Sequence, residues 1–169
     1  MELKDMSDQQ KLGIGIFVIS SIIVLFLTAG CSSKLNRAKE TWIRQVAMPS
    51  IGIDIGYYAR KNRGIYPDTL TNLEFTSTLL TPMPSNPYIS NTPMSVAKEK
   101  SVRDPIAYAS EHSGCRGKST EGQINYYYYP AGRPTSYAIN GCNEKGVIKN
   151  TNGTNYVVYT GVYYEVLHN

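Results

Sequence analysis

Chemistry in this chain of 169 residues would have to come from few reactive side chains. The only histidines are His112 and His168, and the three cysteines are Cys31, Cys115 and Cys142. His112 lies three residues before Cys115, a spacing that could begin a metal site together with Cys142. Tetrahedral zinc takes four ligands, and a disulfide between Cys115 and Cys142 would remove two of them. We therefore predict no metal site from the sequence.

Catalytic patterns are equally sparse. Ser113 follows His112, but no Gly-x-Ser-x-Gly motif surrounds a serine, and a nucleophile and its base are recognised by geometry rather than by adjacency. No run of residues matches a P-loop or a dinucleotide-binding fingerprint. The sequence therefore predicts no catalytic residue, no cofactor-binding residue and no enzyme activity.

Cys115 and Cys142 each lie in a glycine-containing turn, Ser-Gly-Cys-Arg-Gly and Asn-Gly-Cys-Asn. Paired with each other, they would close a loop worth roughly 3 kcal/mol in the chain-entropy model. The alternative is three unrelated reduced thiols in a cytosolic protein. We prefer the disulfide, and with it an oxidising compartment, because a long apolar segment precedes both cysteines.

That apolar segment, residues 12–29, contains no charged residue and would span about 27 Å as a helix, which is enough to cross a bilayer core. It runs into Thr28-Ala29-Gly30-Cys31, with small residues directly before the cysteine. Two outcomes are open. Either the segment stays as a membrane helix, or it is cut before Cys31 and that cysteine becomes the site of lipid attachment. We take residues 1–31 as the signal or membrane-anchor segment and residues 32–169 as one domain.

The orientation of the segment involves a conflict. Lys34, Arg37, Lys39 and Arg44 follow it, and the positive-inside rule would keep that side in the cytoplasm. The paired cysteines and the tyrosine-rich remainder instead indicate an extracytoplasmic domain. We give these features more weight, and predict a membrane-anchored protein with its domain in the periplasm or on the cell surface.

A helical period follows the anchor and predicts one amphipathic helix of about 25 residues ending near Gly64. Pro49 should kink it. Gly52 and Gly56 could allow a sheet to approach closely, or could simply add flexibility. The apolar residues at steps of three or four, expected to face the core, are Leu35, Ala38, Trp42, Val46, Pro49, Ile53 and Tyr57.

The rest of the chain divides into a connecting part and a strand-rich part. Three prolines between residues 82 and 87 predict an extended connector, and residues 89–122 are interpreted as a long surface loop. Nine of the 14 tyrosines follow, in short β-rich runs separated by turns. We expect an α+β fold with a helix packed on an antiparallel sheet of about four strands, two of four adjacent tyrosines facing each way. The four runs are Gln123 to Tyr129, Thr135 to Ile139, Asn155 to Tyr159 and Val162 to Leu167.

The order of these features resembles the type IV pilin and type II secretion pseudopilin family. The most specific similarity is Tyr57-Tyr58-Ala59-Arg60-Lys61-Asn62-Arg63-Gly64-Ile65-Tyr66-Pro67-Asp68 followed by Pro84-Ser85-Asn86-Pro87-Tyr88. Members commonly end a long helix in a similar segment, followed by a Pro-x-Asn-Pro-Tyr turn. The strands around Tyr137-Ala138-Ile139-Asn140-Gly141 are also similar to the C-terminal strands of that family.

The anchor departs from this family. Prepilins contain a glycine followed by a Phe-Thr-Leu-Ile-Glu-like run, and the glutamate helps subunits assemble. The nearest analogue here starts at Gly15 and has Ser20 where the glutamate would stand. The residues before Cys31 instead resemble a bacterial lipobox, although Thr28 is less usual there than leucine.

The resemblance implies a non-enzymatic, pilin- or pseudopilin-like envelope protein, a minor subunit or accessory of a type IV pilus or type II secretion system. Its expected partners are the membrane and other pilin or secretion-system proteins. The formal net charge of +4 is scattered and too weak to indicate nucleic acid. An alternative is a lipoprotein binding module for a surface polymer or ligand, which would use exposed tyrosines and residues 89–122.

Overall fold

The computed structural model describes residues 33–71, 73–77, 79–80 and 82–160. The apolar segment, Cys31 and the predicted strand from Val162 to Leu167 lie outside these residues. No helix within the described ranges is long and apolar enough to cross a membrane. The chain separates into a unit of residues 1–38, whose described part is helical, and a unit of residues 39–169, which holds the sheet.

The helix of the larger unit changes its geometry immediately before a proline. Residues 39–42 are helical, η2 (Ile43–Ala47) is π-helical, and α2 (Met48–Lys61) is a regular α-helix. Pro49 has no N–H, and in a regular helix its ring would clash with the carbonyl of Gln45. The π-helical turn, in which the Met48 N–H donates to the Ile43 carbonyl, puts Pro49 in the first turn of α2, where proline is tolerated.

The predicted core-facing side of this helix is wrong from Val46 onward, although Trp42 does pack against the main core. Val46 is 50% exposed, whereas Asp54 is only 2% exposed. A π-helical turn holds an extra residue, so a single 3.6-residue period cannot continue unchanged across it. The helix residues that are buried are Ile43, Ala47, Met48, Ile51, Gly52, Asp54, Ile55, Tyr58 and Ala59.

The sheet is mixed rather than antiparallel, and has five strands within the described residues. In order they are β1 (Val96–Ser101), β2 (Ile124–Tyr129), β3 (Ser136–Asn143), β4 (Gly146–Val147) and β5 (Val157–Tyr159). The pairing order is β1-β2-β3-β4, with β5 also on β3. Three of the predicted runs contain or overlap β2, β3 and β5. The parallel pair is β1 with β2, and the other pairs are antiparallel.

The interpretation of residues 89–122 as a long loop is also wrong. This stretch contains β1, the helix α4 (Pro105–Glu111) and the short 3-10 helix η3 (Gly117–Thr120). Since β1 and β2 are parallel, the chain needs a crossover between them, and α4 lies in that crossover. The strand β1 is polar and only half-buried, which hid it from a search for apolar alternation.

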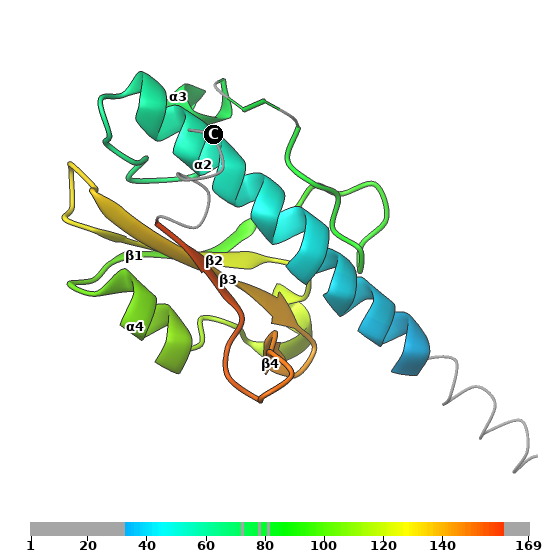
Figure 1. The fold of residues 1–169 in the computed structure, drawn as a ribbon. Helices are drawn as coiled ribbons and strands as arrows, with labels where there is room; N and C mark the ends of the chain where they lie inside the picture. Colours follow the sequence, from blue (N-terminus) through cyan, green and yellow to red (C-terminus); the bar gives the residue numbers. More distant parts are fainter. Residues whose placement is uncertain (1–32, 72, 78, 81, 161–169) are drawn as a thin grey trace, which may run out of the picture. The chain divides into compact units, whose positions relative to one another are not determined.

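The helices α2 and α4 cover opposite faces of the sheet (Figure 1). On the α2 face, Tyr126, Tyr137 and Ile139 join the main core with the buried helix residues. On the other face, Tyr127 and Ala138 pack with Ala109 of α4 in a smaller second cluster. The four adjacent tyrosines therefore alternate as expected, but Tyr127 is buried under α4, while Tyr129 is 42% exposed. The α+β class is confirmed.

Candidate functional site

The disulfide predicted between Cys115 and Cys142 is present. Cys142 lies in β3 and is fully buried, whereas Cys115 is half-buried in the segment that connects α4 to η3. Cys31, the predicted lipid-attachment residue, lies outside the described residues. The bridge therefore joins the end of the crossover to a central strand of the sheet.

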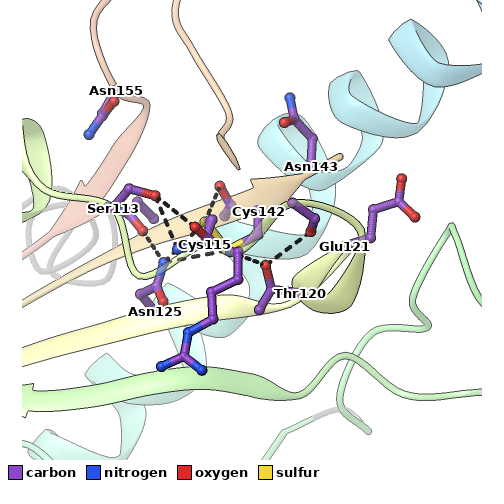
Figure 2. Close-up of a disulfide and its surroundings, with 12 residues drawn as sticks. Ser113, Cys115, Thr120, Glu121, Asn125, Cys142, Asn143 and Asn155 are labelled. Carbon is purple, nitrogen blue, oxygen red and sulfur yellow. Dashed lines mark hydrogen bonds between the residues drawn. A yellow bond between two sulfur atoms is a disulfide. The ribbon is translucent and has the colours of Figure 1, made fainter. Parts of the chain in front are cut away.

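Three buried asparagines connect the neighbourhood of the bridge to α4 by hydrogen bonds, and we call them the asparagine clamp: Asn125, Asn140 and Asn155. Asn125 of β2 lies opposite Asn140 of β3 in the strand register and donates from Nδ2 to its Oδ1 at 2.7 Å. The same Nδ2 lies 3.4 Å from the sulfur of Cys115 and 3.5 Å from that of Cys142. Figure 2 shows Asn125 beside the disulfide.

The other two members of the clamp hold the end of α4. Asn140 Nδ2 and Asn155 Nδ2 donate to the carbonyl of Ala109 at 2.9 Å and 3.0 Å. Both also approach the His112 carbonyl, at 3.4 Å and 3.5 Å. The last carbonyls of a helix have no hydrogen-bond partner inside the helix. The side-chain amides of Asn140 and Asn155 supply the missing donors at the end of α4.

The segment between α4 and Cys115 packs so closely on the sheet that only glycine fits at position 114. A Cβ placed on Gly114 would lie 2.1 Å from Oδ1 of Asn125 and 3.1 Å from Cβ of Lys98. Asn125 is fully buried and held by its own hydrogen bonds, so it cannot yield at low cost. Gly114 thus fixes the path by which the chain reaches Cys115.

Comparisons with protein-family models, with curated proteins and with solved structures gave no significant match to this chain. What the site can do must therefore be argued from its own residues.

His112 and Ser113 are placed for packing and turn formation. The His112 ring stacks on Tyr108 with 4.0 Å between centroids and 4° between planes. The Ser113 hydroxyl accepts the N–H of Cys115 at 3.0 Å. Within the part of the chain that the structure describes, no group of three or more His, Cys, Asp or Glu could hold a metal ion.

An aromatic cluster joins α4 to the sheet. Lys100 Nζ donates to the hydroxyl of Tyr108 at 3.2 Å and lies 4.8 Å from its ring centroid. Tyr127 meets the same ring edge-on at 5.0 Å. Burial, followed by the neighbouring Tyr108, raises the pKa of Tyr127 to about 12, so this phenol stays protonated at physiological pH. These contacts favour packing over proton transfer.

One polar residue of the core was missed because the sequence pattern put it on the solvent side. Asp54 accepts the Leu80 N–H on Oδ1 at 2.9 Å, while its buried Oδ2 has no hydrogen-bond partner. Burial raises the pKa of the Asp54 carboxyl, and the Leu80 hydrogen bond opposes this in part. The burial of Asp54 follows from the sequence only if the extra residue of the π-helical turn is included in the helical period.

The disulfide and the asparagine clamp therefore form a structural site. Their hydrogen bonds connect α4 to β2, to β3 and to Asn155, two residues before β5. The amide nitrogens of the three asparagines hold the fold, whereas Oδ1 of Asn125 is buried without a hydrogen-bond partner.

Proposed function

We propose that this chain is a non-enzymatic, membrane-anchored, pilin- or pseudopilin-like envelope protein, a minor subunit or accessory of a type IV pilus or type II secretion system. The observation that supports this most is the order of its parts. An apolar segment leads into a helix, and residues 43–59 of that helix pack on a sheet that follows the Tyr66-Pro67 and Asn86-Pro87 segments. The disulfide fits an envelope compartment.

The side of the helix that faces away from the sheet is consistent with assembly. Val46, Pro49, Ile53 and Tyr57 follow one another at steps of three or four residues, and we call them the outward stripe. Val46 is 50% exposed and the other three are half-buried, although none is charged. The fold leaves part of this apolar side open to solvent, above all at Val46, and a neighbouring helix could pack on it.

The anchor can be tested directly at Cys31. In the proposed mature form, the chain is cut before Cys31 and that residue is lipidated, which holds the domain at a membrane. Labelled palmitate should be incorporated by the parent chain and lost in Cys31→Ser. Peptide mapping of the mature N-terminus distinguishes the outcomes, since it reports Met1, a cut near Gly15 or a modified Cys31. An unlabelled parent chain contradicts the lipid anchor.

Assembly needs a separate test. The chain should copurify with sheared filaments or with a secretion complex from membranes, and an aspartate at Ile53 should reduce this without unfolding the domain. Aspartate at Gln45, which is exposed and outside the outward stripe, is the matched control. Persistent absence from both fractions would count against a pilus or secretion role.

A binding module for a surface polymer is the second candidate, and one observation favours it. Tyr129 and Tyr159 are 42% and 37% exposed. By strand register they share the α4 face of the sheet, on either side of Ser136 and Ala138. Tyrosine rings can stack on sugars. Retention on a column of cell-surface polysaccharide, lost in Tyr129→Ala with Tyr159→Ala, would support this candidate over the first.

A further inference from the structure

The helix α4 covers a small apolar area of its own. Its buried residues are Pro105 and Ala109, and beneath it Tyr127 and Ala138 are fully or almost fully shielded from solvent. The partly buried neighbours that complete this cluster are Val102, Tyr108 and Val157. A helix of seven residues is too short to be stable alone in water, so α4 stays formed only because it is docked.

The attachments of α4 are unequal at its two ends. At the start, Asp104 accepts the N–H of Ala107 at 3.0 Å, which is a bond within the helix itself, and the Val102 N–H reaches the Tyr128 carbonyl at 2.9 Å. At the end, the sheet supplies Asn140 and Asn155 to the Ala109 carbonyl. The covalent bond at Cys115 follows four residues after Glu111.

The disulfide can be attacked from one side. Cys115 is half-buried and Cys142 is fully buried, so an incoming thiolate meets the Cys115 sulfur first. It would form a mixed disulfide with Cys115 while Cys142 leaves as the thiolate. The amide of Asn125 lies 3.5 Å from the Cys142 sulfur and can donate to that developing negative charge.

We propose that α4 is a lid on the face of the sheet opposite α2, and that the oxidation state of Cys115 and Cys142 sets how often this lid opens. The reductant is a protein dithiol: two electrons and two protons pass to the cystine, giving two thiols, and the dithiol becomes a disulfide. Without the bond at Cys115, α4 is held by the hydrogen bonds of the asparagine clamp, by apolar packing and by the contact of Lys100 with Tyr108.

Opening would enlarge one surface. Tyr127, Ala138 and Tyr159 lie in one row across β2, β3 and β5, and Tyr129 is two residues along from Tyr127 on the same face. Lifting α4 would therefore join the buried Tyr127 to the exposed Tyr129 and Tyr159 in a continuous tyrosine surface. This inference does not depend on membership of a pilus or secretion system.

Hydrogen–deuterium exchange on the full chain in detergent tests the lid. The oxidised protein is compared with the same protein after reduction by dithiothreitol, and with the variant Cys115→Ser with Cys142→Ala, which cannot form the disulfide. We expect the amides of Tyr108 and His112 to exchange about tenfold faster, or more, in the reduced protein and in the variant, as for a local opening. Amides of α2 and β2 should keep their rates.

Two outcomes would overturn the proposal. Unchanged exchange in α4 would mean that packing and the asparagine clamp hold the helix without the disulfide. An equal rise in α2, β2 and α4 would mean that the disulfide stabilises the whole domain rather than a lid. Reoxidation of the reduced wild-type chain must restore the first pattern, which separates opening from irreversible unfolding.

Discussion

At the scale of single residues, Asp54 is a carboxyl group buried in the core with incomplete hydrogen bonding. Its carboxylate is buried with one oxygen unpaired, and burial raises its pKa above the ordinary value of about 3.9. The folded state therefore binds this proton more tightly than the unfolded chain does. The contribution of Asp54 to stability is most favourable below the unfolded pKa and is lost as the pH rises through the raised folded pKa.

We predict that Asp54→Asn flattens the fall in unfolding free energy as the pH rises from about 4 into the neutral range. Urea unfolding across that range measures it. The matched control is Glu99→Gln, because Glu99 also accepts a backbone N–H, from Leu70 at 2.7 Å, but its second oxygen is satisfied by Thr69 at 2.6 Å. Parallel pH profiles for wild type and Asp54→Asn would contradict the assignment.

A second prediction at this scale compares the effect on stability of alanine at Gly114 and at Gly56. Alanine at position 114 would press on Asn125, so we expect a loss of roughly 1–3 kcal/mol or more. At Gly56 an added Cβ meets nothing within 4 Å, and alanine in a helix should add about 0.5–1 kcal/mol. Thermal or urea unfolding of the two variants should give opposite signs. A neutral Gly114→Ala would refute the close packing beside the disulfide.

At the scale of elements, α2 tests the corrected helix phase. Ile51 is fully buried, whereas Ile53 lies in the outward stripe and is half-buried. We expect Ile51→Ala to cost about 2–5 kcal/mol, and Ile53→Ala to cost less than about 1 kcal/mol. Denaturant unfolding of both variants measures the difference. Equal losses would contradict the corrected phase, and a larger loss at Ile53 would restore the phase that the sequence alone predicts.

The same elements show where sequence reasoning succeeds. Sequence reasoning correctly placed β2 and the start of β3, and the disulfide between Cys115 and Cys142 is confirmed. The predicted Asn-Gly-Cys-Asn turn is wrong, because residues 140–143 lie within β3. Sequence reasoning failed where tertiary contacts decide the outcome. Nothing in Val96–Ser101 distinguishes a half-buried parallel strand from a polar loop until Ile124–Tyr129 lies beside it.

The helix phase failed for a related reason. The segment has apolar residues on two sides, and only the π-helical turn before Pro49 and the position of the sheet select which of them is buried. The asparagine clamp could not be predicted from sequence for the same reason. Its members, Asn125, Asn140 and Asn155, come together only after the strands have paired. Asparagine in a strand-forming run was the available signal, because a buried amide needs partners.

At the scale of the whole molecule, an α+β domain carries a helix whose outward stripe is not covered by the sheet. In the proposed function, an anchor holds this domain at a membrane and pilin- or pseudopilin-like subunits pack on the stripe. Neither an enzyme nor a nucleic-acid-binding protein is part of this proposal.

The central claim is that the outward stripe contacts other subunits at the membrane, and crosslinking tests it most directly. A photo-crosslinking amino acid at Ile53 of the full chain, in living cells, should give adducts in the membrane fraction with pilin or secretion-system subunits, identified by mass spectrometry. The same group at Lys61, which is exposed and outside the stripe, should give few. Adducts from Ile53 that contain no such subunit, or equal labelling from both positions, would contradict the proposed function.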